Sequence, residues 1–169
     1  MIEISPLLSE EIVKEHIIPQ IIILLRSECV EAKINVISEL SSLDPKLAEI
    51  LLETILPVIL ELLTHKQWRV RLDIIEHLPL LAGQLKHDIF EEKLTPYCLN
   101  LLNDEVYAIR ETSCKNIKHF VNQYGVDWAN QKVIPKLQEL AKNGNYLRRM
   151  TSLFAMQSFR KIIKSAFLH

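Results

Sequence analysis

The sequence predicts an all-α fold, an α-solenoid of about four helical hairpins wound into a right-handed superhelix. Its composition favours a folded core, because 49% of its 169 residues are hydrophobic, and only three are glycine. A repeat of 38–39 residues runs through the chain, and within it apolar residues recur at spacings of three and four, the period of a helix. Hairpins of this size bury their apolar faces by stacking on neighbours, which is why the array is expected to be continuous.

Four prolines mark the repeat. Separations of 38, 39 and 39 residues lie between Pro19, Pro57, Pro96 and Pro135. When the segments are aligned on these prolines, a leucine follows five residues later and a basic residue fourteen residues later in every copy. The basic column consists of Lys33, Arg71, Arg110 and Arg149. The alignment predicts the tail of a preceding repeat at 1–8 and complete repeats at 9–43, 44–85, 86–125 and 126–169.

Each copy is expected to contain a first helix, a short polar turn and a second helix. The turns are predicted at 26–29, 64–67, 103–106 and 142–145. Eight residues after the prolines stand Ser27, His65, Asp104 and Asn143. All but the histidine are good N-caps, so we expect them to cap the second helices. Longer joints between repeats are predicted near 41–47, 84–92 and 123–131, which are marked by Pro45, by Gly83 directly before the second range, and by Gly125.

The repeated proline has two interpretations. Apolar residues continue upstream of it, as at Ile55 and Leu56, so we expect Pro19, Pro57, Pro96 and Pro135 to kink the first helices from within, at a cost of about 3 kcal/mol each. The alternative is that each proline occupies the first position of its helix, where its missing N–H costs nothing.

An aromatic residue opens three of the four predicted second helices. Trp68, Tyr107 and Tyr146 each lie eleven residues after a proline. Aromatic residues beside bases at a polar turn have the composition of interface hot spots. Stacking is expected to bring the three rings onto one solvent-facing edge, roughly 10 Å apart. The alternative is that each ring packs over its own helix or wedges between repeats.

The bases near these turns fall into two groups. The column of Lys33, Arg71, Arg110 and Arg149 is expected to be structural, a ladder that pairs with acids in neighbouring repeats. Lys66, Arg69 and Arg148 lie next to the aromatic positions and are the better candidates for an acidic partner surface, where they would tune orientation and association rate.

These features resemble two known families. The proline in the first helix and the base early in the second are typical of HEAT repeats, in which a turn Asp and an Arg six residues later commonly form a ladder. Asp104 and Arg110 match that pair. More specifically, the chain is similar to the scaffold (A, regulatory) subunits of protein phosphatase 2A in the strings WRVRLDIIEHLPLLAGQL (68–85), VYAIRETSCKNIKHF (106–120), DWANQKVIPK (127–136) and NYLRRMTSLF (145–154).

The second resemblance implies a non-enzymatic scaffold of which this chain spans a part. In that family the turns between the paired helices hold the phosphatase catalytic subunit, and other repeats hold regulatory B-type subunits. The residues that it implies for partner binding are Lys66, Trp68, Arg69, Asp104, Tyr107, Tyr146 and Arg148.

No sequence motif indicates an enzyme. Phosphate-binding, dinucleotide-binding, zinc-protease and nucleophile-elbow motifs are lacking, and the six histidines are dispersed. Cys29, Cys98 and Cys114 form no CxxC pair and are expected to pack in or near the core. We therefore expect no catalysis, cofactor or metal. With no signal peptide and no apolar run of ~18–20 residues, a cytoplasmic location, and also a nuclear one, is expected, with no membrane partner.

Charge is unevenly distributed and leaves two alternatives. Residues 1–63 contain eleven acids and four bases, whereas residues 132–169 contain eight bases and one acid, and the formal net charge is −1. One alternative is a HEAT-like nucleic-acid-binding module that uses the basic C-terminal repeat. The near-neutral chain argues against it, so no nucleic-acid partner is expected. The other is end-to-end self-association through uncapped helices at the ends of the array.

Overall fold

The computed structural model describes residues 10–27, 29, 32, 35–36 and 45–166. The chain divides into two compact units, Met1–Leu85 and Lys86–His169. Their boundary coincides with the one predicted between the second and third repeats. All the regular elements of the described residues are helical. The predicted tail at 1–8 and Lys33 lie outside the described residues, as does most of 28–44.

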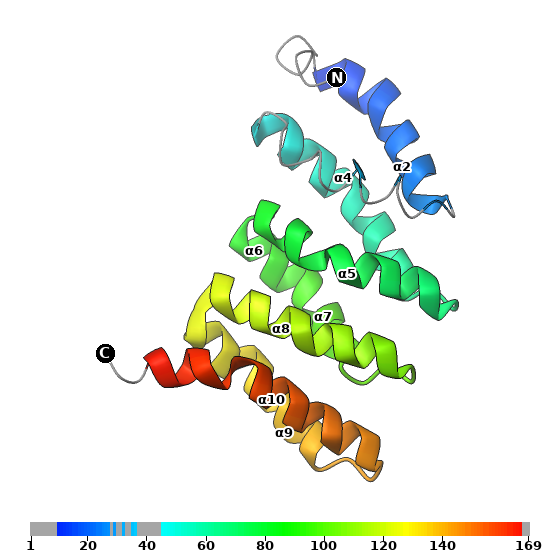
Figure 1. The fold of residues 1–169 in the computed structure, drawn as a ribbon. Helices are drawn as coiled ribbons and strands as arrows, with labels where there is room; N and C mark the ends of the chain where they lie inside the picture. Colours follow the sequence, from blue (N-terminus) through cyan, green and yellow to red (C-terminus); the bar gives the residue numbers. More distant parts are fainter. Residues whose placement is uncertain (1–9, 28, 30–31, 33–34, 37–44, 167–169) are drawn as a thin grey trace. The chain divides into compact units, whose positions relative to one another are not determined.

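The first unit contains a helical run and a complete hairpin. The run consists of α1 (Glu10–Ile12), the π-helical turn η2 (Val13–Ile17) and α2 (Ile18–Arg26). The hairpin consists of α4 (Pro45–Leu63) and α5 (Trp68–Gln84), joined by the turn at 64–67 (Figure 1). Helix α4 packs against both α2 and α5.

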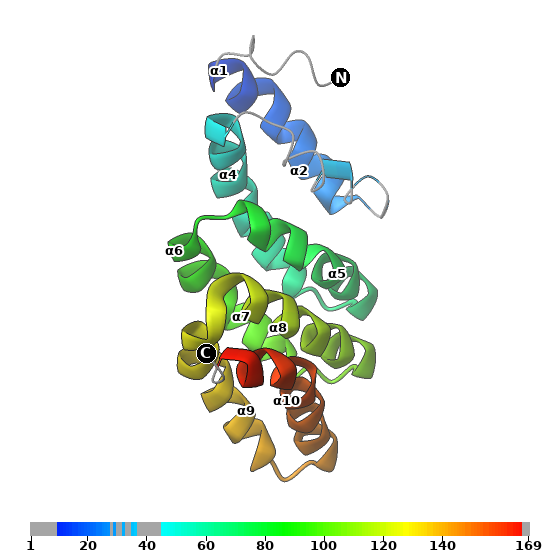
Figure 2. The ribbon, with the colours of Figure 1, turned by 60° about the vertical axis from the view of Figure 1, so that its left-hand side comes forward.

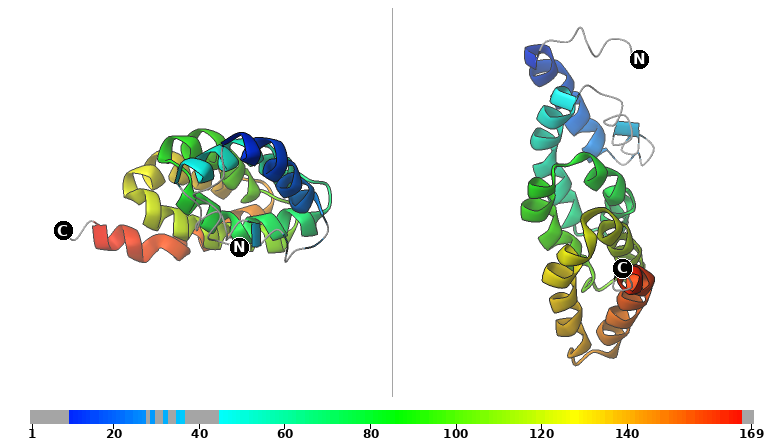
Figure 3. Two further views of the ribbon diagram at one scale, coloured as in Figure 1. Left: turned by 90° about the horizontal axis from the view of Figure 1, so that it is seen from above. Right: turned by 90° about the vertical axis from the view of Figure 1, so that its left-hand side faces the viewer.

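The second unit contains two hairpins. In the first, α6 (His87–Ile89), the π-helical turn η4 (Phe90–Leu94) and α7 (Thr95–Leu101) precede α8 (Tyr107–Trp128). In the second, η5 (Ala129–Val133) and α9 (Ile134–Ala141) precede α10 (Tyr146–Ala166). Helix α10 packs against both α8 and α9. Figure 2 and the right-hand view of Figure 3 show α9 and α10 as an antiparallel pair joined by the turn at 142–145.

The apolar spacing expected from the sequence lines the cores of these hairpins. In the first unit, the side chains of Ile55, Ile59, Ile74 and Leu81 are completely buried. Leu62, Leu78 and Leu85 are buried as well, whereas Val70 is only half-buried. The predicted helical faces are therefore confirmed, except at the N-terminal end of α5.

An aromatic cluster fills the second unit where η4 meets the end of α8. The rings of Phe90 and Tyr124 are stacked with centroids 4.2 Å apart, and Phe120 and Trp128 lie 5.0 Å and 6.0 Å from Phe90. Phe90, Phe120 and Trp128 are each at most 5% exposed. Because aromatic pairs add to ordinary apolar burial, this cluster holds the first helix of the hairpin against the far end of the second.

Three of the four repeated prolines follow a π-helical turn. Pro19, Pro96 and Pro135 lie two residues after η2, η4 and η5 respectively, in the first turn of the α-helix that follows. The residue before each proline donates its N–H to the carbonyl five residues earlier, as Thr95 does to Phe90. Widening the helix in this way relieves the clash between a proline ring and the carbonyl four residues before it. The helical run continues through the proline, and Pro57 lies inside the α-helix α4.

Two of the three predicted joints between repeats lie wholly within the described residues, and both are shorter than predicted. Only Leu85 and Lys86 separate α5 from α6, and Gly83 lies within α5. The second joint is Gly125 alone, with φ 88° and ψ 176°, and the chain is helical on both sides of it. This backbone conformation is essentially restricted to glycine, so a single residue redirects the chain where a nine-residue loop was expected.

The all-α class, built from consecutive helical hairpins of the solenoid type, is confirmed. Each hairpin has an intra-repeat turn at the position predicted from the sequence, at 64–67, 103–106 and 142–145 within the described residues. The right-handed superhelix depends on how the two units are oriented and stays a prediction.

Candidate protein-binding surface

The intra-repeat turns share one local hydrogen bond. A side chain at the eighth position after the proline accepts a bond from the main-chain N–H two residues later. The four bonds run from Cys29 to Ser27 Oγ (3.3 Å), from Gln67 to His65 Nδ1 (3.2 Å), from Val106 to Asp104 Oδ1 (2.9 Å) and from Asn145 to Asn143 Oδ1 (2.9 Å). His65 takes this role because an unprotonated ring nitrogen accepts as an oxygen does.

This bond corrects the predicted capping role. The N-cap residues of α5 and α8 are Gln67 and Val106, and neither makes a side-chain cap. His65 and Asp104 lie two residues earlier and stabilise the turn rather than the first amides of the helix. In the last hairpin, Asn145 also accepts a bond from the N–H of Leu147 through its Oδ1 (2.9 Å).

The arginines of the basic column bind main-chain carbonyls of the same turns. Each described arginine donates through Nη1 to the carbonyls six and five residues before it. Arg71 binds the carbonyls of His65 (2.6 Å) and Lys66 (3.2 Å), Arg110 those of Asp104 (2.8 Å) and Glu105 (2.9 Å), and Arg149 those of Asn143 and Gly144 (both 2.9 Å). The ladder prediction placed the partners in neighbouring repeats, whereas these bonds lie within one turn. They supply donors for carbonyls that the first helix and turn leave unpaired.

Arg110 also connects its turn to the next hairpin. Its side chain is buried, and Nε donates to Oγ1 of Thr151 on α10 at 3.1 Å. Arg148 reaches back from α10 to donate to the carbonyl of Asp104, so two guanidinium groups share that oxygen. Burial lowers the pKa of Arg110, and the charge of Arg148 lowers it further. Asp104 and Arg110, which match the HEAT pair, thus meet through the main-chain carbonyl of the aspartate.

The aromatic positions begin their helices as predicted. Trp68, Tyr107 and Tyr146 are the first residues of α5, α8 and α10. Tyr107 is 58% exposed and Tyr146 is 63% exposed. In the second unit these two tyrosines therefore stand at equivalent ends of two helices that pack side by side.

Trp68 belongs to the first unit and has a different environment. Its ring is half-buried, and the guanidinium of Arg69 lies 4.7 Å from the ring centroid, a cation–π distance. An edge shared by all three rings stays a prediction, because Trp68 lies in the other unit.

The remaining predicted binding residues differ in how accessible they are to a partner. Lys66 and Arg69 are exposed, so they are accessible to a partner. Asp104 and Arg148 are half-buried, and both participate in the inter-helix contact just described. Their first role is to position the turn, since their polar atoms are already engaged within the second unit.

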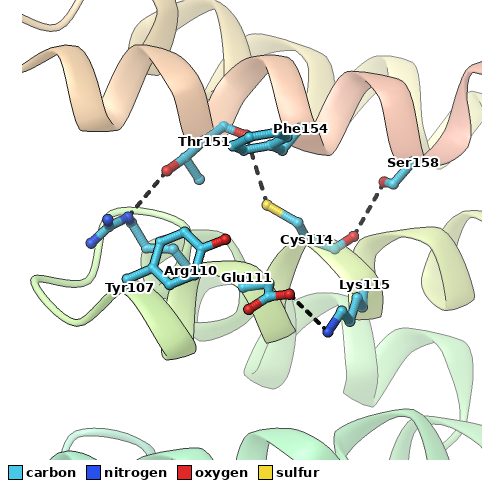
Figure 4. A pocket seen from close by; sticks show the side chains of 8 residues that line it. All are labelled: Tyr107, Arg110, Glu111, Cys114, Lys115, Thr151, Phe154 and Ser158. Carbon is cyan, nitrogen blue, oxygen red and sulfur yellow. Dashed lines mark hydrogen bonds and ion pairs between the residues drawn. The ribbon is translucent and has the colours of Figure 1, made fainter.

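A groove of about 240 Å³ lies between α8 and α10 (Figure 4). Figure 4 shows the rings of Tyr107 and Phe154, contributed by the two helices, together with the ion pair between Lys115 and Glu111 (3.1 Å). The groove is lined by Tyr107, Arg110, Glu111, Cys114, Lys115, Thr151, Phe154 and Ser158. Sequence reasoning missed its α10 residues, because the repeat alignment gives equivalent positions but not the register between neighbouring helices.

Consecutive helical hairpins joined by hydrogen-bonded turns define a helical-repeat protein, a class that uses such surfaces to bind other proteins. Within it, residues 94–124 match the family model of the HEAT repeat, so the chain contains a HEAT repeat. The match runs from the end of η4 to the residue before Gly125. A search of curated proteins found no match to the chain.

The described residues lack the features of two other kinds of site. None of their helices is both long enough and apolar enough to span a bilayer. They also contain no group of three or more His, Cys, Asp or Glu side chains placed to hold a metal ion.

Proposed function

We propose that this chain is a protein-binding scaffold that holds the catalytic subunit of a Ser/Thr phosphatase of the protein phosphatase 2A type at its intra-repeat turns. The observation that carries the proposal is the pair Tyr107 and Tyr146. Both are more than half exposed, and both begin the second helix of their hairpin. Large aromatic side chains presented on a surface in this way are the usual anchors of protein interfaces.

The turns suit this role because they are held in place before a partner arrives. A side-chain acceptor fixes one side of each turn, and an arginine fixes the carbonyls on the other. A pre-organised contact surface loses little conformational entropy on binding. The scaffold would therefore act by display, presenting the catalytic subunit near regulatory B-type subunits without taking part in the chemistry.

The choice of a phosphatase as partner is supported by the sequence. The strings at 68–85, 106–120, 127–136 and 145–154, which resemble the phosphatase scaffold family, include the three aromatic positions and the three arginines that bind the turn carbonyls. The exposed bases Lys66 and Arg69 favour an acidic surface on the partner.

Binding of the full chain to purified phosphatase catalytic subunit tests the proposal, with the catalytic subunit immobilised and the chain titrated over it. We expect Tyr107→Ala to weaken binding about tenfold, which corresponds to ~1.4 kcal/mol, and Trp68→Ala to weaken it at least as much. His119→Ala is the matched control, because His119 is an exposed ring on the same helix as Tyr107 but remote from the turn.

Two results would contradict the proposal. One is the lack of any binding by the wild-type chain at high micromolar concentration. The other is an equal effect of Tyr107→Ala and His119→Ala, which would place the contact elsewhere.

A further inference from the structure

Helix α10 exposes an apolar face. Leu147 and Met150 are each 40% exposed, Phe154 is 48% exposed and Leu153 is 60% exposed. Their spacings of three, three and one residues place them along one side of the helix. A group of neighbouring apolar side chains on a surface marks a site where another molecule binds, unlike single exposed apolar residues, which are common.

The repeat shows what kind of element fits this face. Leu153 lies eighteen residues after Pro135, and Cys114 lies eighteen after Pro96. Cys114 is only 6% exposed, because α10 covers it. Its Sγ lies 3.7 Å from the carbonyl of Thr151, and Ser158 Oγ donates to its carbonyl at 3.2 Å. The position that a neighbouring helix covers on α8 is thus open on α10.

The same comparison separates α10 from α8 at two more positions. Met150 and Phe154 are equivalent to Glu111 and Lys115, which form an exposed ion pair on α8. Where α8 presents charge to solvent, α10 presents a thioether and a phenyl ring. The open face of α10 is therefore complementary to an apolar helical surface.

The charged residues near the α10 face indicate which kind of surface can bind to it. Arg149 and Arg160 are exposed on α10, and residues 132–169 contain eight bases and one acid. Two α10 faces brought together would therefore bring like charges together, which costs free energy. The opposite composition lies in residues 1–63, with eleven acids and four bases. There, the α1–α2 run exposes Ile12 (42%) and Ile23 (60%) together with the carboxylates of Glu11 and Glu15. The run also exposes Lys14 and Arg26, and Arg26 pairs with Glu61 on α4 (2.8 Å).

We propose that the α10 face binds a second copy of this chain, through the acidic and apolar surface of that copy's α1–α2 run. The contact joins two different surfaces, so a dimer formed through one contact keeps one open surface of each kind, and further copies add head to tail unless a ring closes. Apolar burial supplies the attraction, and the opposite charges select the orientation. The proposal does not depend on the phosphatase assignment.

Sedimentation velocity on the full chain tests for this association. The weight-average mass is expected to rise with protein concentration past that of a dimer. The association constant is expected to fall severalfold between about 0.05 M and about 0.5 M salt, because screening weakens the charge pairing. A monomer at every concentration would overturn the proposal.

A mixing experiment separates head-to-tail contact from the pairing of two identical faces. One variant, Leu153→Gln with Phe154→Gln, removes the apolar surface of α10. The other, Ile12→Gln with Ile23→Gln, removes that of the α1–α2 run. All four side chains are exposed, so both variants should retain the circular dichroism spectrum of the wild type.

Each variant alone is expected to be monomeric, and an equimolar mixture is expected to form a dimer through its one intact pair of surfaces. If the variant altered at Ile12 and Ile23 still dimerises alone, the α10 faces pair with each other and the proposal is wrong. If the mixture stays monomeric although the wild type associates, a different surface is responsible, and the proposal is equally wrong.

Discussion

Arg71, Arg110 and Arg149 occupy equivalent positions and make equivalent bonds to their turns, yet their surroundings differ. Arg110 is 4% exposed and reaches Thr151 on the next hairpin, whereas Arg149 is exposed. A hydrogen bond contributes more to stability when its loss leaves a buried group without a partner. Substitutions of Arg110 and Arg149 can therefore separate the stability contributed by the contact between hairpins from that contributed by the bonds to the turn carbonyls.

Arg110→Ala is expected to lower the free energy of unfolding by about 2–3 kcal/mol, because it removes the bond to Thr151 as well as both turn bonds. Arg149→Ala removes the turn bonds alone and should cost less than about 1 kcal/mol. Urea titration followed by circular dichroism measures both values. Equal losses would show that the contact with Thr151 contributes nothing.

The buried thiols are a second residue-scale feature. Burial raises the pKa of Cys98 to about 12 and that of Cys114 to about 11. The prediction that all three cysteines pack in or near the core is therefore correct for these two and wrong for Cys29, which is exposed. A thiol that is harder to ionise in the folded state than in the unfolded state stabilises the fold fully at pH values below its unfolded pKa. That contribution is lost as the pH rises towards the folded pKa.

The free energy of unfolding is therefore expected to be steady near pH 7.5 and to decrease above about pH 8.5, where unfolded thiols begin to ionise. In Cys98→Ala the decrease between about pH 7.5 and about pH 10 should be smaller than in the wild type by about 1–2 kcal/mol. Urea titrations of both proteins at the two pH values measure this difference. Parallel curves for the two proteins would contradict the prediction.

At the scale of the elements, the chain accommodates residues that disfavour a helix in two ways. A π-helical turn precedes Pro19, Pro96 and Pro135, so the helix passes through the proline without interruption. Gly125 instead breaks the helix at a single residue with a positive φ. The two remaining glycines have no positive φ, and Gly83 lies inside α5. Gly125 therefore occupies a backbone conformation that favours glycine, whereas Gly83 occupies a helical position where other residues are more favourable.

Gly125→Ala is expected to lower the free energy of unfolding by about 1–3 kcal/mol, because alanine is strained at this φ and ψ. Gly83→Ala should raise it by about 0.5–1 kcal/mol, since alanine is the better helix former and a Cβ at Gly83 meets no atom within 4 Å. Thermal and urea unfolding of both variants measure the signs. Destabilisation by both substitutions would show that Gly83 is required for another reason.

For the whole molecule, the distribution of charge favours protein partners over nucleic-acid partners. The basic region at 132–169 has several of its charges already occupied. Lys132 pairs with Glu91 (2.7 Å), Lys136 pairs with Glu139 (2.9 Å), and Arg148 and Arg149 donate to main-chain carbonyls. With a formal net charge of −1 for the chain, and with these four bases engaged within the second unit, the described part of this region is less suited to a nucleic-acid backbone than its composition alone indicates.

We therefore expect duplex DNA to bind only weakly at low salt and not measurably at about 0.15 M salt, in a fluorescence anisotropy titration with the full chain. Tight binding with a steep salt dependence would contradict this expectation and favour the nucleic-acid alternative. A titration with a DNA-binding protein of known affinity serves as the positive control.

The helices, the turns and the residues that begin the helices could all be found in the sequence, whereas the contacts between hairpins could not. Hydrophobic spacing, turn residues and the repeated proline are local properties, because a helix forms bonds only a few residues apart. The alignment therefore located Tyr107, Tyr146 and the arginine column correctly. It did not indicate that these arginines bind the turn carbonyls, since the turn carbonyls carry no signature in the sequence.

The contacts between hairpins depend on how the helices pack against one another. The contact of Arg110 with Thr151, the return of Arg148 to the Asp104 carbonyl and the groove beside Phe154 all join α8 to residues about forty positions away. Such pairs depend on the register and crossing of two packed helices, which follow from how side chains interdigitate and not from either helix alone. The chain's local pattern was therefore sufficient to predict hairpins, and only their tertiary packing showed which side chains remain exposed to a partner.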